Sequence, residues 1–334
     1  MFMPKNIIIE ENALEYKVGK NIYNFFKNKK IPIKINKTGR VGYLGDTPTE
    51  VYKNGKSTLV VGIRKKSKFQ SCKPSAHYQL PLVSGCMGMC EYCYLNTQMG
   101  KYPYTKIYVN ILDLLNQAKN YSLERENEIT IFEGAATSDP LPVEPYTNSL
   151  RDTIEFIGKE EFMRFRFVTK YTEVDSLLDA KHNGHTEIRF TLNTKHVIKN
   201  FEHKTPSFEE RINAARKTYD AGYKVGILIA PIFLYNNWQE EYKMLIKVIH
   251  ATLPFDDITF EIITHRYTST AKNIILDIFP QTILPMNDDV RQFKFGQFGY
   301  GKYIYTKDEI SMIKEFFYSQ LTKYYPKESI LYMI

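Results

Sequence analysis

Cysteine is scarce in this sequence of 334 residues: there are four, Cys72, Cys86, Cys90 and Cys93. A disulfide scaffold would need more numerous and more widely spread cysteines, so the three thiols that lie close together indicate a metal site. The chain also lacks an apolar run of membrane-spanning length, since the longest, Val225 to Leu234, is only as long as a strand. The N-terminus, where a short apolar patch meets carboxylates at once, is unlike a signal peptide. We therefore expect a cytoplasmic protein without a membrane partner.

Charge of one sign is in modest excess, because 45 lysine and arginine residues oppose 37 aspartate and glutamate residues, a formal net charge of +8. Such an excess suits a polyanionic partner such as nucleic acid, and it equally describes a solvated basic surface. Hydrophobic residues make up 43% of the chain, which is enough for one large core, or for one core with an appended lobe. Composition therefore allows nucleic-acid binding without requiring it.

Strand-like apolar runs alternate with helical patterns through the middle of the chain. Helical spacing marks Ile111 to Tyr121 and Trp238 to His250, and a capping box at Ser207 to Glu210 begins a third helix. Strands alternating with helices imply parallel β/α units, and six units are too few to close an eight-stranded barrel. The sequence therefore predicts an α/β protein with a partial, six-unit β/α barrel, whose strands lie at about 78–83, 128–133, 163–169, 187–192, 224–231 and 258–263.

Three parts are expected along the chain: an N-terminal extension over 1–75, the barrel over 76–285 and a C-terminal part over 286–334. In the extension we expect a helix, a loop and two strands, at Tyr16 to Phe26, Thr38 to Lys56, Ile31 to Ile35 and Thr58 to Ile63. In the C-terminal part we expect a β-hairpin, a helix and a last strand, at Arg291 to Tyr305, Lys307 to Lys323 and Ser329 to Ile334.

The cysteine loop reads VSGCMGMCEYCYLNT, with Cys86, Cys90 and Cys93 in the spacing C-x-x-x-C-x-x-C. A 4Fe–4S cluster normally takes four thiolates, so three from one loop leave one iron open for chemistry. A zinc site would need Cys72, which stands far from the other three, and zinc sites favour paired C-x-x-C modules. A ferredoxin-like electron carrier would need a fourth ligand. The loop therefore favours a catalytic 4Fe–4S cluster.

This motif resembles that of the radical S-adenosylmethionine enzymes. Four blocks in order, CMGMCEYCYLNT, FEGAATSDP, FTLN followed by HVIKNFEH, and GQFGYGKYIY, resemble the spore photoproduct lyase family. The resemblance implies that S-adenosylmethionine on the cluster yields a 5′-deoxyadenosyl radical, which takes hydrogen from carbon 6 of two thymines joined through a methyl carbon. It also implies a UV-damaged DNA substrate, an external electron donor of flavodoxin or ferredoxin type, and a location in the spore core.

Within the resemblance, residues at strand ends would hold S-adenosylmethionine. Tyr92 can lie against the adenine ring, and simple packing is an equal alternative. Glu133, Ser138 and Asp139 follow the second strand, where carboxylate and hydroxyl oxygens can accept from an ammonium group. The remaining candidates are placed at the ends of the third, fourth and fifth strands: Lys170, Thr191, Asn193 and Ala230.

One departure from the family concerns the hydrogen donor. The family usually has a cysteine where this chain has Ala136, and alanine has no weak bond to hydrogen to offer. Either the chain is inactive or another residue donates, and Cys72 is the only cysteine left, although a lone cysteine is commonly a small buried apolar residue. Tyr94 resembles the family's tyrosine that relays the radical.

The hairpin near the C-terminus alternates basic and aromatic residues. Basic side chains can contact phosphates and aromatic ones can stack on bases, so we expect it to bind DNA through Arg291, Lys294, Phe298, Tyr300, Lys302 and Tyr303. An ordinary amphipathic hairpin is the alternative. His265, just past the sixth strand, is expected to be structural.

Two other functions stay open. A radical enzyme of this kind could act on RNA or another molecule. A catalytically dead, cluster-containing nucleic-acid-binding protein is the other, which Ala136 encourages.

Overall fold

The structure, a computed structural model, describes residues 1–65, 67–100, 102–126, 128–295, 299 and 301–334. The chain forms two compact units. The first unit comprises Met1–Met87, Met99–Ile188 and Asp220–Tyr223, and the second comprises Gly88–Gln98, Arg189–Tyr219 and Lys224–Ile334. The cysteine loop passes from one to the other, so Cys86 belongs to the first unit and Cys90 to the second. The three-part functional division over 1–75, 76–285 and 286–334 stays a prediction.

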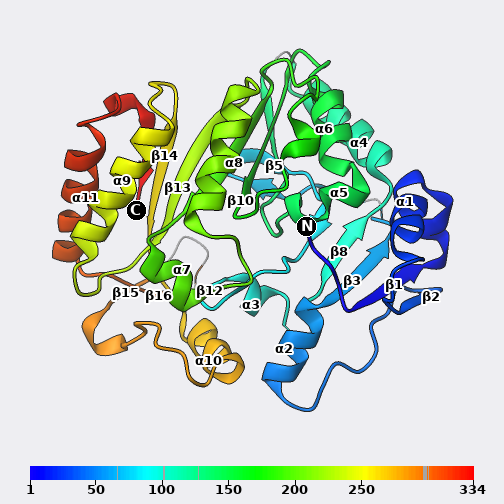
Figure 1. Cartoon of the computed structure of the whole chain (residues 1–334), viewed down its shortest axis with the longest axis horizontal. Coiled ribbons are helices and arrows are strands. Elements are labelled where there is room, and N and C mark those ends of the chain that lie inside the picture. Colours follow the sequence, from blue (N-terminus) through cyan, green and yellow to red (C-terminus); the bar gives the residue numbers. More distant parts are fainter. Residues whose placement is uncertain (66, 101, 127, 296–298, 300) are drawn as a thin grey trace. The chain divides into compact units, whose positions relative to one another are not determined.

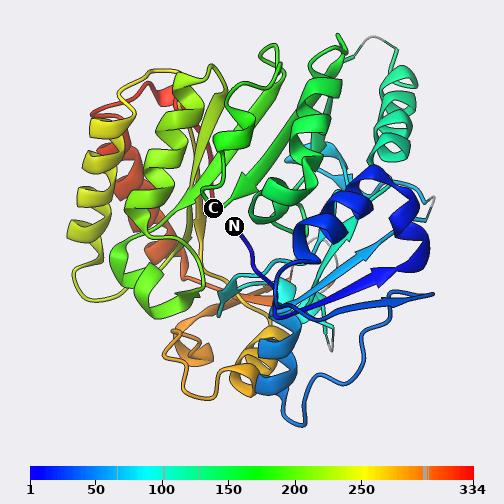
Figure 2. The same ribbon diagram turned by 45° about the vertical axis from the view of Figure 1, so that its right-hand side comes forward.

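The N-terminal residues build most of a parallel sheet in the first unit. Its strand order is β2-β1-β3-β8-β6, and only β6 runs antiparallel to its neighbour. Helix α1 connects β1 to β2 and lies alongside the blue strands in Figure 2. The expected helix and two strands of the extension are confirmed. The elements are β1 (Asn6–Glu10), α1 (Lys17–Phe26), β2 (Ile33–Asn36), β3 (Thr58–Gly62), β6 (Val83–Ser84) and β8 (Thr105–Tyr108).

The loop expected from Thr38 to Lys56 is wrong in its second half, where helix α2 spans Pro48–Lys56. Thr47 and Glu50 form a capping box there, and Pro48 occupies the first turn, where its missing N–H costs nothing. The glycines and prolines between Thr38 and Lys56 led to the loop prediction, although Thr47, Pro48 and Glu50 are typical of a helix start.

A second group of strands in the first unit carries candidate site residues. β5 (Ala76–Gln79), β9 (Thr130–Glu133) and β10 (Met163–Thr169) are parallel, and β4 (Ser71–Cys72) pairs antiparallel with β5. Helices α4 (Ile111–Leu123) and α6 (Ser149–Ile157) pack on β9 and β10 (Figure 1). The expected strand over 78–83 is wrong in its second half, because Pro81 cannot donate to a ladder and β6 pairs with β8 instead.

The second unit contains the parallel strands β13 (Lys224–Ile232), β14 (Thr259–Thr264) and β17 (Ile330–Met333). β11 (Thr186–Leu192) begins in the first unit and ends in the second. β7 (Met89–Cys90) and β12 (Glu202–His203) form a short antiparallel pair, and β15 (Gln292–Phe295) with β16 (Gly301–Ile304) forms the expected hairpin. The helices are α3 (Leu95–Gln98), α7 (Lys195–Phe201), α8 (Phe208–Asp220, its last residue in the first unit), α9 (Trp238–Thr252), α10 (Ser269–Ile278) and α11 (Lys307–Leu321).

Parallel strands that alternate with helices confirm the α/β class. The expected capping box is present, since Ser207 Oγ accepts from the Glu210 N–H at 3.3 Å and the Glu210 carboxylate accepts from the Ser207 N–H at 2.7 Å. Short connections remain: the 3-10 turns Glu11–Glu15, Leu141–Val143, Asp175–Leu177, Asp288–Val290 and Lys327–Ser329, and the single turn α5 (Glu144–Thr147). No helix in the described parts of the chain is both long and apolar enough to cross a bilayer.

Candidate active site

The first-unit end of the cysteine loop is fixed by a glycine and a buried lysine. Gly85 has φ of +78°, and a Cβ there would lie 2.4 Å from the Tyr104 carbonyl oxygen, so only glycine fits. Its N–H donates to the Thr137 carbonyl oxygen at 3.0 Å. Lys56, 2% exposed, donates from Nζ to the Cys86 carbonyl oxygen at 2.7 Å. The backbone of Cys86 is thereby fixed in place by a buried side chain.

The second-unit end of the loop is held by the β7–β12 pair. Cys90 lies opposite Glu202, and the Glu91 N–H donates to the Phe201 carbonyl oxygen at 2.9 Å. Buried Asn96 donates from Nδ2 to the carbonyl oxygens of Cys90 and Glu91, at 3.2 and 3.1 Å. These bonds fix the loop backbone before any ligand is bound.

The three loop cysteines fit a cubane cluster. Cys90 is buried and Cys86 and Cys93 are half-buried, and none of the chain's four cysteines, all of them described, is in a disulfide. Within the described ranges no three His, Cys, Asp or Glu side chains are grouped closely enough for a single metal ion. A 4Fe–4S cubane does not need its three cysteine ligands to meet at one metal ion, because each thiolate binds a different iron.

Tyr92 and Tyr94 lie in different surroundings in the second unit. The Tyr92 hydroxyl donates to the Glu202 carboxylate, and its ring lies 5.9 Å from that of Phe233. Burial, followed by the nearby carboxylate, raises the pKa of Tyr92 well above its usual value, so it stays a donor. These contacts favour packing for Tyr92 over adenine stacking. Tyr94 is 53% exposed.

A buried ion pair links Tyr92 to the end of β11. Arg211 and Glu202 are both fully buried, with Nη2 and Oε2 2.6 Å apart. Arg211 also donates to the Thr191 carbonyl oxygen at 3.2 Å, and its remaining N–H groups reach Thr205 Oγ1 and the Pro206 carbonyl oxygen at 2.7 and 2.9 Å. The guanidinium is satisfied within the protein.

Glu133 lies at the end of β9, 3% exposed, on the polar face of the first unit's second strand group. Its carboxylate accepts from the Ala135 N–H at 3.2 Å and from Arg166 Nε at 3.3 Å. Arg166 also reaches Ser75 Oγ and lies 3.8 Å from the Glu187 carboxylate. Charged groups of both signs therefore line this face, which a wholly apolar core would not tolerate.

The loop after β9 carries two more candidates. Ser138 forms an isolated parallel bridge with Gly85, so this loop lies directly beside Cys86. The Asp139 carboxylate accepts from Thr169 Oγ1 at 2.8 Å, from the Lys170 N–H at 3.0 Å and from the Leu141 N–H at 3.3 Å. Burial raises the pKa of Asp139 to about 6, against these hydrogen bonds. Asp139 thus joins the ends of β9 and β10, and Lys170 extends from this joint.

The candidates of the second unit cluster where β11 and β13 end. Asn193 is fully buried; its Nδ2 donates to the Pro231 carbonyl oxygen at 2.8 Å, and its Oδ1 accepts from the Thr194 N–H and the Tyr242 hydroxyl at 2.9 and 3.0 Å. Thr191 is buried, and Ala230 is half-buried in β13. Asn193 is therefore a structural tie between the strand ends.

Cys72 and Ala136 both belong to the first unit and are both half-buried. Cys72 ends β4, where it pairs with Ala76. The connection between them includes Ser75, whose hydroxyl accepts from Arg166. The Cys72–Ser75 turn therefore lies against the polar face formed by Arg166 and Glu133.

The expected DNA-binding residues are divided by the structure. Lys294 and Lys302 face each other across the β15–β16 pair, whereas Phe298 and Tyr300 lie outside the described residues. The Arg291 guanidinium lies 3.6 Å from the Tyr305 ring centroid and donates to the carbonyl oxygens of His265 and Pro285. Tyr303 stacks on Tyr267 with ring centroids 5.3 Å apart. Arg291 and Tyr303 thus anchor the hairpin to the rest of the second unit.

His265 fits the structural interpretation. It is 3% exposed, and burial lowers its pKa to about 3, assisted by Arg291, so the ring is neutral.

Sequence reasoning missed several side chains that hold the site. Glu202 lies within the block HVIKNFEH, which carried the family resemblance, but the sequence indicated no role for this residue. Lys56, Asn96, Arg166 and Arg211 gave no local signal, because each acts on a residue distant in sequence or on a backbone carbonyl.

The chain is similar to known proteins over almost its whole length. The family model described as spore photoproduct lyase matches residues 2–334. The spore photoproduct lyase of Clostridium acetobutylicum is 52% identical over 333 residues, 99% of both chains, and that of Bacillus subtilis is 44% identical over 338 residues, 99% of this chain and 98% of the relative. A solved spore photoproduct lyase complexed with dinucleoside spore photoproduct superposes with a TM-score of 0.94 at 42% identity, covering 100% of this chain and 99% of that one.

A second solved relative, with bound AdoMet and dinucleoside spore photoproduct, gives a TM-score of 0.94 at 43% identity over the same shares of the two chains. The fold is thus the partial β/α barrel of these enzymes. The chain belongs to the spore photoproduct lyase family, radical S-adenosylmethionine enzymes that carry a 4Fe–4S cluster and repair the spore photoproduct.

Proposed function

We propose that this chain reverses the spore photoproduct in UV-damaged DNA to two thymines, with Cys86, Cys90 and Cys93 as the ligands of the cluster. The observation that carries this is the cysteine loop, held by Lys56 at one end and by the β7–β12 pair at the other. When bound, the cluster and S-adenosylmethionine supply the 5′-deoxyadenosyl radical that takes hydrogen from the lesion. The protein must hold that cofactor, expose the lesion and return a hydrogen atom.

Replacing any loop cysteine with alanine should abolish the iron content and the repair together. The check is iron and sulfide analysis after anaerobic reconstitution, with Cys72→Ala as the matched control, which should keep its cluster. Full iron and turnover in a loop variant would contradict the assignment.

Cys72 is the hydrogen donor in this proposal. Its S–H bond is the weakest suitable bond among the side chains, and the loop thiolates are committed to iron. The S–H bond breaks as a C–H bond forms on the thymine radical, which leaves a thiyl radical on Cys72. Tyr94 then gives its hydroxyl hydrogen to that sulfur, so the unpaired electron passes to the phenol oxygen before the cofactor is regenerated.

A solved relative supports this choice. In that spore photoproduct lyase one cysteine is replaced by alanine and one serine by cysteine, and the two changes are separated by as many residues as Cys72 and Ala136 are here. This chain has the same pair of residue types in its own sequence. Another solved relative carries a Tyr→Phe change, which draws attention to a tyrosine such as Tyr94.

The test is Cys72→Ala and Cys72→Ser in the reconstituted enzyme, since serine keeps the size and polarity but has a stronger bond to hydrogen. Both variants should still cleave S-adenosylmethionine, yet clean repair should fall and adducts of the thymine radical should appear. Clean repair by Cys72→Ala would exclude the thiol. No cleavage even by the unaltered chain would leave a catalytically dead DNA-binding protein.

S-adenosylmethionine is held, in this proposal, by residues at or near strand ends: Glu133, Ser138, Asp139, Lys170, Thr191, Asn193 and Ala230. Lys170 is the candidate whose side chain is best suited to pair with the cofactor carboxylate, whereas Asp139 and Asn193 act mainly by holding the strand ends in place. Lys170→Ala should therefore weaken cofactor binding, measured by calorimetry, while the cluster still assembles. Unchanged affinity would contradict this role.

The β15–β16 hairpin is proposed to engage the DNA and to help hold the lesion out of the helix. Two lysines opposite each other in a sheet repel, which costs stability unless an anion lies between them. Phe295 is 71% exposed and available to stack or wedge. Lys294→Glu with Lys302→Glu should weaken DNA binding and flatten its salt dependence. Unchanged affinity and salt slope would make the hairpin merely structural.

The electron that starts the reaction would come from an external flavodoxin or ferredoxin. A DNA substrate within the spore further implies action in the cytoplasm of the spore core.

A further inference from the structure

A basic surface segment lies next to the cysteine loop in the second unit. We define it as residues 195–204, which comprise α7, β12 and Lys204. It exposes three lysines, Lys195, Lys199 and Lys204, whereas its one carboxylate, Glu202, is fully buried against Arg211. Lys195 is partly offset by Glu209, 2.5 Å away on α8. The exposed charge of the segment itself is entirely positive.

The basic segment is in direct contact with a cluster ligand's strand. β12 pairs with β7 so that Glu202 lies opposite Cys90, and the carbonyl oxygen of Phe201 accepts from the Glu91 N–H at 2.9 Å. His203, whose side chain is 41% exposed, bonds the Glu91 carboxylate at 2.7 Å. A partner on this segment would therefore be one strand spacing from the backbone of Cys90.

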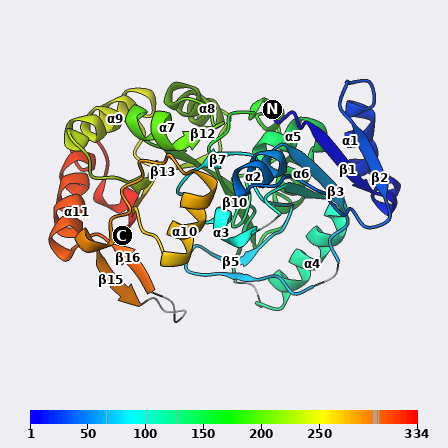
Figure 3. The same ribbon diagram turned by 90° about the horizontal axis from the view of Figure 1, so that it is seen from below.

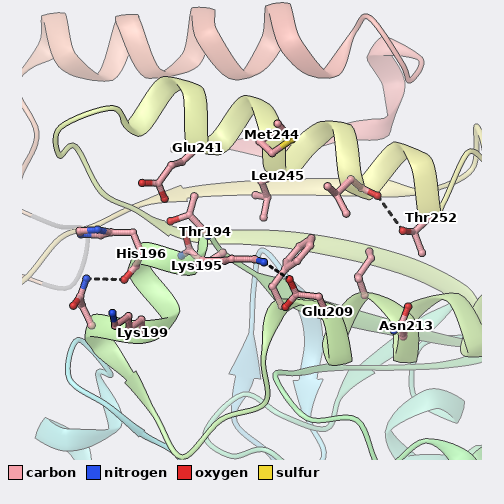
Figure 4. Close-up of a pocket in the computed structure, with 15 residues that line it drawn as sticks. Thr194, Lys195, His196, Lys199, Glu209, Asn213, Glu241, Met244, Leu245 and Thr252 are labelled. Carbon is pink, nitrogen blue, oxygen red and sulfur yellow. Dashed lines mark hydrogen bonds and ion pairs between the residues drawn. The ribbon is translucent and has the colours of Figure 1, made fainter.

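A groove of about 720 Å³ adjoins the segment between α8 and α9 (Figure 4). Lys195, His196 and Lys199 line one end of it. Apolar side chains, among them Leu245 and Met244, line much of the rest together with polar ones and the carboxylates of Glu209 and Glu241, and Met244 is 59% exposed. A hollow with an exposed methionine among apolar side chains has the make-up of a protein-binding surface, and the lysines of the basic segment lie at one end of it.

The basic segment and the hairpin proposed for DNA pack on one hydrophobic cluster, to which Val197 and Phe201 of α7 belong and against which Tyr303 of β16 packs. In the second unit, α7 and β12 lie on one side of α10 and the β15–β16 hairpin lies on another (Figure 3). The lysines of the segment and those of the hairpin are different residues, so the two surfaces can be changed separately.

We propose that the basic segment and its groove dock an acidic one-electron carrier protein, which delivers the electron to the cluster. This rests on the proposed function, because only a cluster that must be reduced needs such a partner. Negative charge on the carrier would meet Lys195, Lys199 and Lys204, and an apolar side chain would enter the groove. One electron leaves the carrier and one enters the cluster, and no proton or group moves. The close approach to β7 shortens the path, on which the rate of electron transfer depends steeply.

The experiment uses the reconstituted holoenzyme and purified flavodoxin as the probe. Lys199→Glu with Lys204→Glu should weaken flavodoxin binding about tenfold at low salt, measured by calorimetry, because like charges now face each other. Reduction of the cluster by reduced flavodoxin, followed by its visible absorbance, should slow in parallel. Reduction and repair driven by dithionite, a small molecule that needs no docking surface, should be unchanged. The matched control is Lys314→Glu, an exposed lysine on α11 of the same unit, which should change none of these.

Equal flavodoxin affinity and reduction rate in the double variant would overturn the proposal. So would a loss of affinity for damaged DNA with flavodoxin binding intact, since the segment would then be a DNA surface. If the charge-reversed protein does not fold, Lys199→Gln with Lys204→Gln serves instead and should weaken flavodoxin binding severalfold. Failure of dithionite-driven repair in the unaltered enzyme would refute the proposed function, and flavodoxin binding would still report on the docking surface.

Discussion

Arg211 in the second unit and Arg166 in the first are both held by carboxylates, yet they differ in how completely. Arg211 is fully buried, pairs with Glu202 at 2.6 Å and spends its other N–H groups on Thr205 and two backbone carbonyls. Such a guanidinium has nothing left to offer a ligand. It fixes the position of Glu202, and through it Tyr92.

Arg166 is held more loosely. It is 13% exposed, its distances to Glu133 and Glu187 are 3.3 and 3.8 Å, and it also reaches Ser75 in the turn that follows Cys72. Longer contacts on a face that water reaches leave room for exchange with a substrate or cofactor. The comparison teaches that burial of a charge does not by itself identify a functional residue. A buried charged group whose hydrogen bonds are all made within the protein is structural, whereas one with weaker contacts can still bind a ligand.

The largest effect should come from Arg211→Met. It leaves Glu202 buried without its counter-ion, which should lower the free energy of unfolding by about 3–5 kcal/mol. Denaturant unfolding of the apoprotein checks this. Adding Glu202→Leu should recover part of the loss, since the unpaired charge is then gone. If Arg211→Met lowers the free energy of unfolding by less than about 1 kcal/mol, Arg211 is no more important for stability than Arg166.

The second prediction concerns Asp139 in the first unit, a buried carboxylate whose oxygens already accept several hydrogen bonds within the protein. Burial raises the pKa of Asp139 to about 6 in the folded protein, from 3.8. The folded state then binds the proton more tightly, so the stability from this group is full below pH 3.8 and is lost as the pH rises through about 6. Asp139→Asn should remove this dependence, a difference on the order of 2 kcal/mol between pH 4 and pH 6. Parallel stability curves for the two proteins would show that Asp139 titrates normally.

Arg166→Met should have a smaller effect on stability, about 1–2 kcal/mol, because its contacts are longer and partly hydrated. Repair should fall by more than this instability explains, since the polar face beside the Cys72 turn loses its cation. The matched control is Arg164→Met, two residues earlier on the same strand face, bonded only to nearby carbonyls. Equal turnover in the two variants would assign Arg166 a structural role like that of Arg211.

The smallest effect is expected for Tyr242→Phe. It removes the hydroxyl that donates to Asn193 Oδ1 at 3.0 Å and accepts from the Phe233 N–H at 3.2 Å, and should cost about 1 kcal/mol. Because Asn193 keeps its bonds to Pro231 and Thr194, cofactor affinity should stay the same. A large drop in S-adenosylmethionine affinity would mean that Asn193 needs the hydrogen bond from Tyr242 to be positioned for cofactor binding.

The sequence predicted what is written locally. Period-two and helical patterns located β10, β13 and α9, and the spacing of Cys86, Cys90 and Cys93 identified their chemistry. The start of α2 was also written locally, in Thr47 and Glu50, and was overlooked. The supports of the site could not be found in this way. Tyr92 and Glu202 are 110 residues apart, and Lys56 acts on a backbone carbonyl, which has no residue type to leave a signal.

The β7–β12 pair also determines when, during synthesis of the chain, the cysteine loop can take its folded position. Glu91, in the cysteine loop, and His203, its partner in β12, are separated by 112 positions. At about 5–20 residues per second, the thiols emerge roughly 5–20 s before the strand that positions them. Over that interval Cys86, Cys90 and Cys93 are on an unfinished chain and exposed to oxidants. The loop can thus be fixed for iron loading only after residue 203 of 334 has been made, and the thiols must stay reduced until then.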